Sequence, residues 1–228
     1  MRAVVLIHLA LFSLFLHASG FRFMDAARER TRDLMSEVYQ HPFLEELFKG
    51  TLPRNKWDYY YAQDLIYLTH FNNALLVLSW KTSDTVMGMF LAEEARTYVS
   101  HEKQLGGVLP CPSCKEYAEF ETKSVDKSFE LGLAALVPCY VVYDEVGIWL
   151  RSRLTQNNHY EQEIQKIFGE KPSKSARAVE EYINMVAERE SEETRQQMLE
   201  IYYRSVKYEL EFWDSAYKLA PEFEEQEL

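Results

Sequence analysis

The chain has 228 residues, of which 47% are hydrophobic and 14% aromatic. This length predicts one domain with enough apolar side chains for a sizeable core. Acidic residues outnumber basic residues by 36 to 25, which gives a formal net charge of −11. A field of that sign repels phosphate backbones, and the sequence has no dense basic run, so we expect no nucleic-acid partner.

The first 20 residues have the pattern of a secretory signal peptide. Arg2 precedes an apolar run from Ala3 to Leu16, and small residues follow at positions 18, 19 and 20. The run is too short for a comfortable membrane span, and no other stretch is predicted to be long and apolar enough. We therefore expect a secreted or secretory-lumen protein, free of the membrane after cleavage, with its domain at 21–228. An uncleaved anchor is the alternative.

Helical periodicity dominates the rest of the chain, which holds only 8 Gly and 7 Pro. A short segment begins near Pro42 and ends before Gly50. The other expected helices lie near residues 23–39, 56–79, 83–105, 114–123, 128–154, 160–168, 175–188 and 191–220. We find no internal repeat and no linker, so the pattern predicts an all-α fold, a single bundle of about seven to eight helices.

Two of these helices carry further signals. Thr51 or Asn55 is expected to cap the helix at 56–79. Pro138 lies inside the helix at 128–154, where it lacks a backbone N–H and is expected to kink the helix and free a carbonyl group.

The sequence contains three cysteines. Cys111 and Cys114 could form a disulfide in a secretory compartment, which would leave Cys139 as a free thiol. A structural zinc site needs four ligands, and neither a second Cys-x-x-Cys pair nor a histidine pair at zinc-finger spacing is present. We expect no metal site at these cysteines.

Four segments, taken in order, form a recognisable pattern. They read HPFL at 41–44 with KGTLP at 49–53, YAQDLIYL at 61–68, PCY at 138–140 with YDEVG at 143–147, and YELEFWDSAY at 208–217. Together they resemble the TenA/thiaminase II family, whose fold is the haem-oxygenase-like helical bundle. The resemblance covers residues 24–220.

The resemblance implies a catalytic set. Cys139 matches the family's nucleophile, and Asp64 matches the aspartate that holds the pyrimidine amino group beside it. Glu209 matches the carboxylate that hydrogen-bonds the ring and acts as general acid and base. The substrate-binding rings of the family match Tyr67, Tyr117, Tyr143 and Phe212, with a looser alignment around Tyr117.

The spacing of these residues agrees with their implied roles. Each of three helices offers one reactive group and one aromatic ring three or four positions later, and that spacing places both on one helix face. The pairs are Asp64 with Tyr67, Cys139 with Tyr143, and Glu209 with Phe212. A carboxylic acid that protonates an electron-poor aminopyrimidine makes the ring a target for a thiolate. A buried glutamate that is partly protonated near neutral pH suits this chemistry.

One family element is degraded. The family has a YxxWIxxY segment after the cysteine helix, and the equivalent here runs from Tyr160 to Ile167. Glu163 replaces the tryptophan and Ile167 replaces the last tyrosine, which supports the catalytic glutamate in the family. Because Ile167 cannot donate a hydrogen bond, the protonation of Glu209 must be set differently here. Catalysis could then be slower, altered in substrate, or lost.

The resemblance implies a hydrolase that acts on thiamin or its aminopyrimidine breakdown products, without a cofactor and as a homotetramer. Thiamin cleavage and release of hydroxymethylpyrimidine from an aminomethyl precursor both remain open. A non-enzymatic thiamin- or pyrimidine-binding protein is the alternative. A metal or haem enzyme on the same fold is a third, although Glu94 and His101 lack the partners of a di-iron site.

Overall fold

The computed structural model describes residues 21–97 and 108–219, and this part of the chain is helical without any strand. Its nine helices are α2 (Phe23–Tyr39), α3 (Pro42–Lys49), α4 (Arg54–Lys81), α5 (Thr85–Thr97), α6 (Pro112–Lys127), α7 (Phe129–Arg151), α8 (Glu161–Phe168), α9 (Lys174–Arg189) and α10 (Glu192–Leu219). The all-α prediction is confirmed. The nine helices of the described residues correspond to the nine predicted segments and exceed the overall expectation of seven to eight.

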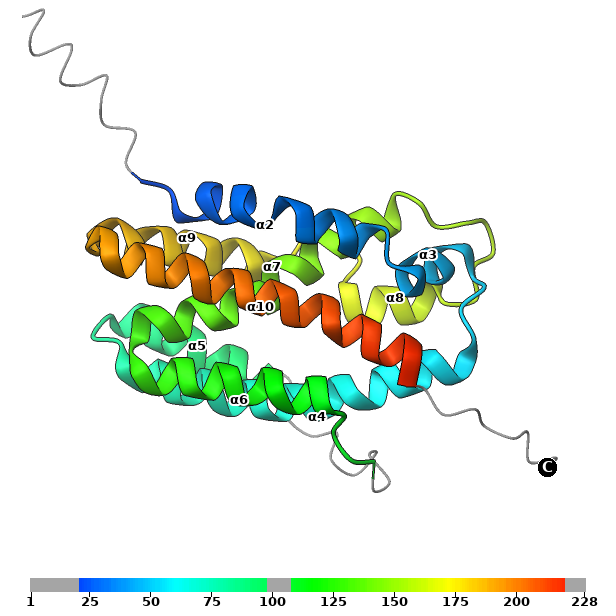
Figure 1. Cartoon of the computed structure of the whole chain (residues 1–228), viewed down its shortest axis with the longest axis horizontal. Coiled ribbons are helices and arrows are strands. Elements are labelled where there is room, and N and C mark those ends of the chain that lie inside the picture. Colours follow the sequence, from blue (N-terminus) through cyan, green and yellow to red (C-terminus); the bar gives the residue numbers. More distant parts are fainter. Residues whose placement is uncertain (1–20, 98–107, 220–228) are drawn as a thin grey trace, which may run out of the picture.

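The long helices lie roughly lengthwise in one bundle, and the short helices α3 and α8 lie near one end of it (Figure 1). Helix α7 contacts α6, α9 and α10, and α4 contacts α5, α6 and α10. Helices α4, α7 and α10 are the three predicted to carry the reactive side chains. The bundle therefore places their chemistry in its interior.

Local sequence signals explain where several helices begin and end. The His41 ring accepts a hydrogen bond from the backbone N–H of Phe43 at 3.1 Å, at the start of α3. Gly50 ends the same helix with a φ of 72°, a left-handed conformation that favours glycine. At α7, the Ser128 hydroxyl accepts a hydrogen bond from the N–H of Leu131.

Helix α7 is the apolar centre of the bundle. By length and composition alone it could cross a membrane, so the prediction that no stretch after the first 20 residues is long and apolar enough is wrong. Its most apolar window is 67% buried inside the protein. Helices α6, α9 and α10 cover it, as expected for a core helix.

Pro138 lies within α7, and the helix continues across it to Arg151. Pro138 has no N–H to donate to the carbonyl oxygen of Ala134, four residues earlier. At the neighbouring position, the buried Ser205 hydroxyl of α10 donates to the carbonyl oxygen of Ala135 at 2.9 Å. This bond ties α7 to α10 one turn before Cys139.

Most predicted helix boundaries agree with the structure to within a few residues. The cap of α4 is an exception, because Pro53 occupies that position in place of Thr51 or Asn55. Proline supplies a fixed φ there and no side-chain hydrogen bond. The predicted signal peptide at 1–20 and the end of the helix expected at 83–105 lie outside the described residues.

Candidate active site

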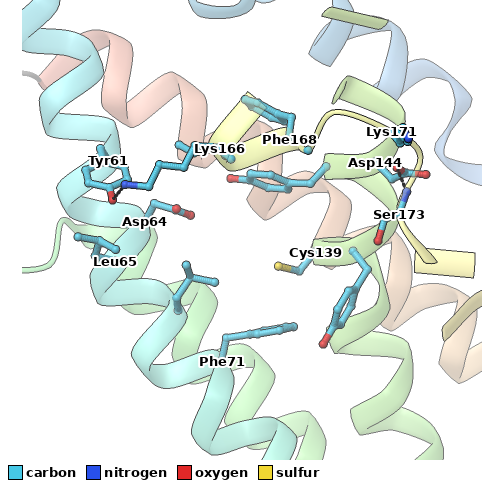
Figure 2. A pocket seen from close by; sticks show the side chains of 15 residues that line it. Tyr61, Asp64, Leu65, Phe71, Cys139, Asp144, Lys166, Phe168, Lys171 and Ser173 are labelled. Carbon is cyan, nitrogen blue, oxygen red and sulfur yellow. Dashed lines mark hydrogen bonds between the residues drawn. The ribbon is translucent and has the colours of Figure 1, made fainter. Parts of the chain in front are cut away.

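A cavity of about 400 Å³ opens between α4, α7, α8 and the segment 169–173, and fifteen residues line it. Figure 2 shows side chains from these elements converging on it. Three of the seven predicted site residues, Asp64, Cys139 and Tyr143, are among the lining residues. The volume lies within the range of small-molecule sites.

Asp64 and Cys139 face the cavity from different helices. Figure 2 shows the Asp64 carboxyl projecting from α4 and the Cys139 thiol from α7. Asp64 is buried, and this burial raises the pKa of its carboxyl to about 7. At neutral pH a large share of the Asp64 side chains is therefore uncharged, and a neutral carboxylic acid can donate a hydrogen bond as well as accept one.

Glu209 is a buried acid held by a tyrosine. The Tyr117 hydroxyl donates to Glu209 Oε1 at 2.9 Å, which links α6 to α10. Burial raises the pKa of Glu209 to about 8, the Tyr117 hydrogen bond opposes the rise, and the charge of Asp64 adds to it. Glu209 is therefore mainly a carboxylic acid at neutral pH, which is the state that a proton donor needs.

The Cys139 thiol is half-buried and free. Burial raises its pKa well above the ordinary value, and the nearby Glu209 and Glu121 carboxylates add to the rise. The Tyr67 hydroxyl acts in the opposite direction and lowers the pKa of the thiol. The thiol is therefore protonated in the free protein, and reactivity requires a change in its surroundings.

Tyr143 belongs to an aromatic wall. Its hydroxyl lies 2.9 Å from the hydroxyl of Tyr60, which is fully buried on α4. The Phe168 ring stacks on Tyr143 with centroids 5.4 Å apart. Gly147 permits this arrangement because a Cβ there would lie 2.8 Å from the Phe168 carbonyl oxygen. Arg151 donates to the same carbonyl oxygen at 3.0 Å and holds Phe168 in place.

Tyr67, Tyr117 and Phe212 lie behind the cavity wall. All three are buried and do not line the cavity itself. The Tyr67 ring stacks on the Tyr117 ring, with the ring centroids 5.0 Å apart. The centroids of the Tyr67 and Phe212 rings are 6.0 Å apart. The structure thus brings all seven predicted residues into one region, in two layers.

Polar contacts close two sides of the cavity. Lys166 of α8 donates to the Tyr61 hydroxyl of α4 at 2.8 Å, and the backbone N–H of Ser173 donates to Asp144 Oδ1 at 2.6 Å (Figure 2). Ile167 lines the cavity, so the position where the resemblance expects a tyrosine belongs to the site. The hydrogen bond to Glu209 comes instead from Tyr117, which the resemblance had assigned to substrate binding.

Glu121, a further buried acid of this region, was not predicted from the sequence. This α6 residue is 1% exposed, and Tyr67 donates to its Oε1 at 2.7 Å. Its other oxygen, Oε2, is buried and has no hydrogen-bond partner among the described residues. Burial raises the pKa of Glu121 well above the ordinary value. Its position four residues after Tyr117, on the same helix face, was the available signal.

Glu94, one of the two residues considered for a di-iron site, has another partner. It accepts a hydrogen bond from the Ser175 hydroxyl at 2.8 Å. His101 lies outside the described residues. Within 21–97 and 108–219, no group of three or more His, Cys, Asp or Glu side chains could hold a metal ion.

Cys111 and Cys114 are both buried free thiols, so the possible disulfide is not formed in this structure. They lie at the start of α6 and are anchored to Gln63, the neighbour of Asp64. The Gln63 side-chain oxygen accepts from the backbone N–H of Cys111 at 2.8 Å, and the Cys114 thiol lies 3.7 Å from the Gln63 carbonyl oxygen.

These features define a class of protein: an all-α bundle that surrounds a ligand-sized cavity with a thiol, carboxylic acids and stacked aromatic rings. The model of the TENA/THI-4/PQQC family matches residues 28–219, which include every predicted site residue, and the chain belongs to this family.

Individual relatives agree with this assignment. An aminopyrimidine aminohydrolase of Bacillus subtilis (strain 168) is 30% identical over 216 residues, covering 86% of this chain and 90% of that protein. An aminopyrimidine aminohydrolase of Halalkalibacterium halodurans is 23% identical, covering 83% and 92%. The solved structure of the TenA homologue from P. horikoshii OT3 has a TM-score of 0.74 and 22% identity, covering 87% and 99%, which shows that the fold is shared.

Proposed function

We propose that this protein is a hydrolase that cleaves a C–N bond next to an aminopyrimidine ring, in thiamin or in its aminopyrimidine breakdown products. Two relatives whose similarity covers most of this chain are named aminopyrimidine aminohydrolases. The observation that carries the proposal is the convergence of the Cys139 thiol and the Asp64 carboxyl on one cavity, with the Glu209 acid buried nearby.

Glu209 acts as the acid of the reaction. Its pKa of about 8 keeps it protonated at neutral pH, so it can give a proton to a ring nitrogen. The protonated ring withdraws electrons and becomes an electrophile. Asp64, which is half neutral near pH 7, is suited to bind the exocyclic amino group by accepting its hydrogen bond.

Cys139 acts as the nucleophile. The thiol gives up its proton as its sulphur forms a bond with the ring. The C–N bond then breaks and the bonding pair leaves with nitrogen, and the thiol proton passes to the departing amine, or to solvent when neutral thiazole departs. Water then supplies a hydroxyl group to the pyrimidine product, the sulphur–carbon bond breaks, and the remaining water proton returns to the Cys139 sulphur. Glu209 first donates and later recovers the ring proton, which closes the cycle.

The cavity wall supports recognition of a flat ring. The Tyr143 and Phe168 rings and the Phe71 side chain line the cavity, and aromatic faces favour offset stacking with a pyrimidine. The Tyr60 hydroxyl fixes Tyr143 from behind. A rigid wall of this kind lowers the entropy lost on binding.

The test is hydrolysis of thiamin and of aminomethylpyrimidine by residues 21–228, measured beside Cys139→Ser and the control Cys111→Ser. We expect turnover of one or both substrates to fall at least about a hundredfold in Cys139→Ser, because the nucleophile is lost. Cys111→Ser keeps turnover. Equal turnover by wild-type protein and Cys139→Ser contradicts the proposal.

A thiamin- or pyrimidine-binding protein without turnover is the second candidate. Two observations favour it: the Cys139 thiol has a strongly raised pKa, and Ile167 stands where the family has tyrosine. Under this function, pyrimidine raises the melting temperature of wild-type protein and of Cys139→Ala equally, and neither substrate is cleaved.

We also propose that the protein is secreted and forms homotetramers. Residues 1–20 have the signal-peptide pattern, and amino-terminal sequencing of secreted protein is expected to begin near residue 21. For assembly, Trp80, Val86 and Met89 leave an exposed apolar surface at α4 and α5. Light scattering is expected to give four chains per particle, and fewer after Trp80→Lys.

A further inference from the structure

The charged residues of the cavity are arranged by depth. Among the fifteen residues that line it, Lys166 and Lys171 are the two exposed ones, whereas Asp64 is buried. The fourth charged side chain, Asp144, is intermediate in exposure. The two lysines therefore mark the opening of the cavity to solvent, and the Asp64 carboxyl lies inside. Neither lysine has a task in the proposed reaction.

Lys166 is held at the opening by a tyrosine of α4. Its ammonium group donates to the Tyr61 hydroxyl at 2.8 Å and lies 5.0 Å from the centroid of the Tyr61 ring. Figure 2 shows the Lys166 side chain reaching from α8 toward Tyr61. Tyr61 precedes Asp64 by three residues on the same helix face, and both line the cavity. An ammonium group has three N–H donors, so two of the Lys166 donors remain for a ligand.

Lys171 adds a second ammonium group from the segment 169–173. Among the described residues, neither Lys166 nor Lys171 forms a salt bridge with a carboxylate. Five other lysines of the described part do form one, and they are Lys49, Lys115, Lys123, Lys207 and Lys218. The charges of the two cavity lysines are therefore not neutralised by a direct carboxylate partner.

The opening of the cavity is positive, although the chain as a whole has a formal net charge of −11. Two lysines stand against the single carboxylate of Asp144, whose Oδ1 accepts a hydrogen bond from the backbone N–H of Ser173 at 2.6 Å. Asp64 lies deeper, and burial raises the pKa of its carboxyl to about 7, so part of its negative charge is absent at neutral pH. A concave opening with this balance attracts an anionic group.

We propose that the cavity binds phosphate monoesters, with the phosphate group at Lys166 and Lys171 and the pyrimidine ring inside, beside Asp64 and Cys139. Ammonium groups form charge-assisted hydrogen bonds with phosphate oxygens. The inference deepens the proposed function and rests on it for the identity of the ring. The phosphate ester bond takes no part in the cleavage of the C–N bond.

The charge of the ligand gives this site its selectivity. Thiamin carries a cationic thiazolium ring, which the two lysines repel. A phosphate group adds a charge of about −1.5 to −2 at pH 7, so the monophosphate of thiamin is an anion overall. A cavity of about 400 Å³ is in the range that accommodates ligands larger than one pyrimidine ring. The preferred thiamin ligand is therefore its phosphate ester.

The experiment compares binding of thiamin monophosphate and thiamin by isothermal titration calorimetry. Cys139→Ser protein is used, so that turnover does not interfere, at a salt concentration of about 50 mM to limit screening. We expect the monophosphate to bind at least about tenfold more tightly than thiamin. Adding Lys166→Gln and Lys171→Gln is expected to abolish this preference without weakening the binding of thiamin.

Two further variants separate the charge of the lysines from damage to the fold. Lys174→Gln is the matched control, because Lys174 is exposed nearby but does not line the cavity, and the preference for the monophosphate is expected to persist. Lys166→Arg with Lys171→Arg keeps both charges and is expected to keep most of the preference. Equal affinity for the two ligands in Cys139→Ser overturns the proposal, as does a preference that survives when both lysines are glutamine.

The phosphate could be carried on either side of the bond that breaks. Hydroxymethylpyrimidine phosphate, compared with hydroxymethylpyrimidine, tests the pyrimidine side, and thiamin monophosphate tests the leaving-group side. A preference that depends on the two lysines supports the proposal in either pair and identifies the side.

The phosphate site and the hydrolase function can fail separately. If wild-type protein hydrolyses no substrate but the preference depends on the lysines, the hydrolase function fails and the phosphate site stands. If thiamin is hydrolysed but neither phosphate ester is preferred, the hydrolase function stands and the phosphate site is overturned.

Discussion

The Tyr117 hydroxyl lies 2.9 Å from Oε1 of Glu209, so α6 supplies the donor that holds the buried acid of α10. Tyr117 is 1% exposed and Glu209 is 2% exposed, which protects the bond from water. The hydrogen bond favours the ionised form of Glu209, while burial, the larger effect, favours the neutral form. Their balance leaves the pKa of Glu209 near 8.

Replacing Tyr117 with phenylalanine is expected to raise the pKa of Glu209, because the carboxylate loses its donor. Glu209 then stays protonated to higher pH, and the alkaline decline of kcat/KM moves upward by about one pH unit. The pH profile of hydrolysis measures this shift. Tyr208→Phe is the control. The Tyr208 ring stacks on the Tyr117 ring with centroids 5.2 Å apart, but the hydrogen bond to Glu209 comes from Tyr117. An unchanged alkaline limb contradicts the assignment of Glu209 as the acid.

The buried carboxyls predict how stability depends on pH. Asp64 and Glu209 have pKa values near 7 and 8 in the folded protein, against 3.8 and 4.5 for unperturbed groups. The folded state therefore holds more protons between these limits. Its free energy of unfolding decreases as pH rises from about 4 to 8, by roughly 1.4 kcal/mol per pH unit for each group.

Asp64→Asn and Glu209→Gln are expected to remove part of this dependence, because the amides do not titrate. Thermal melts at pH 5 and pH 8.5 measure it, and each variant should lose less stability than wild-type protein over that interval. Asp58→Asn is the control, an exposed residue of α4 paired with Arg54. A variant that loses as much stability as wild-type protein shows that its carboxyl is not buried as described.

The tyrosine pair behind the cavity should be energetically coupled. Tyr143→Phe leaves the fully buried Tyr60 hydroxyl without its partner, and we expect a loss of about 1–3 kcal/mol in the free energy of unfolding. Tyr60→Phe should cost less, because Tyr143 lines the cavity and can reach water. Urea denaturation of both variants and the double variant gives the coupling. Strictly additive losses mean that the two hydroxyls do not interact.

The number of free thiols per chain can be measured chemically. The structure has three free thiols, so thiol titration of unreduced, denatured protein is expected to find three per chain. A disulfide between Cys111 and Cys114 would reduce the count to one. In the native state Cys139 should react first, since it is half-buried whereas the other two are buried. Protein treated with reductant provides the reference value of three.

Much of the fold was predictable from the sequence because helix formation is local. Proline and glycine punctuation together with apolar periodicity placed most helix ends within a few residues, as at Gly50 and Ser128. The cap of α4 was predicted wrongly because Thr51 and Asn55 are good capping residues by type, whereas the chain begins that helix after Pro53. Residue type alone does not determine which candidate is used.

The sequence by itself determined which side chains share a helix face, since a spacing of three or four residues has a fixed geometry in a helix. It thus grouped Asp64 with Tyr67 and Cys139 with Tyr143. Only the tertiary structure decided which helix faces meet and how deeply their side chains are buried. It brought Glu121 against Tyr67 from another helix, and within the described part of the chain one oxygen of that acid has no hydrogen-bond partner. Burial and its effect on pKa arise from the surrounding helices together, so no single helix encodes them.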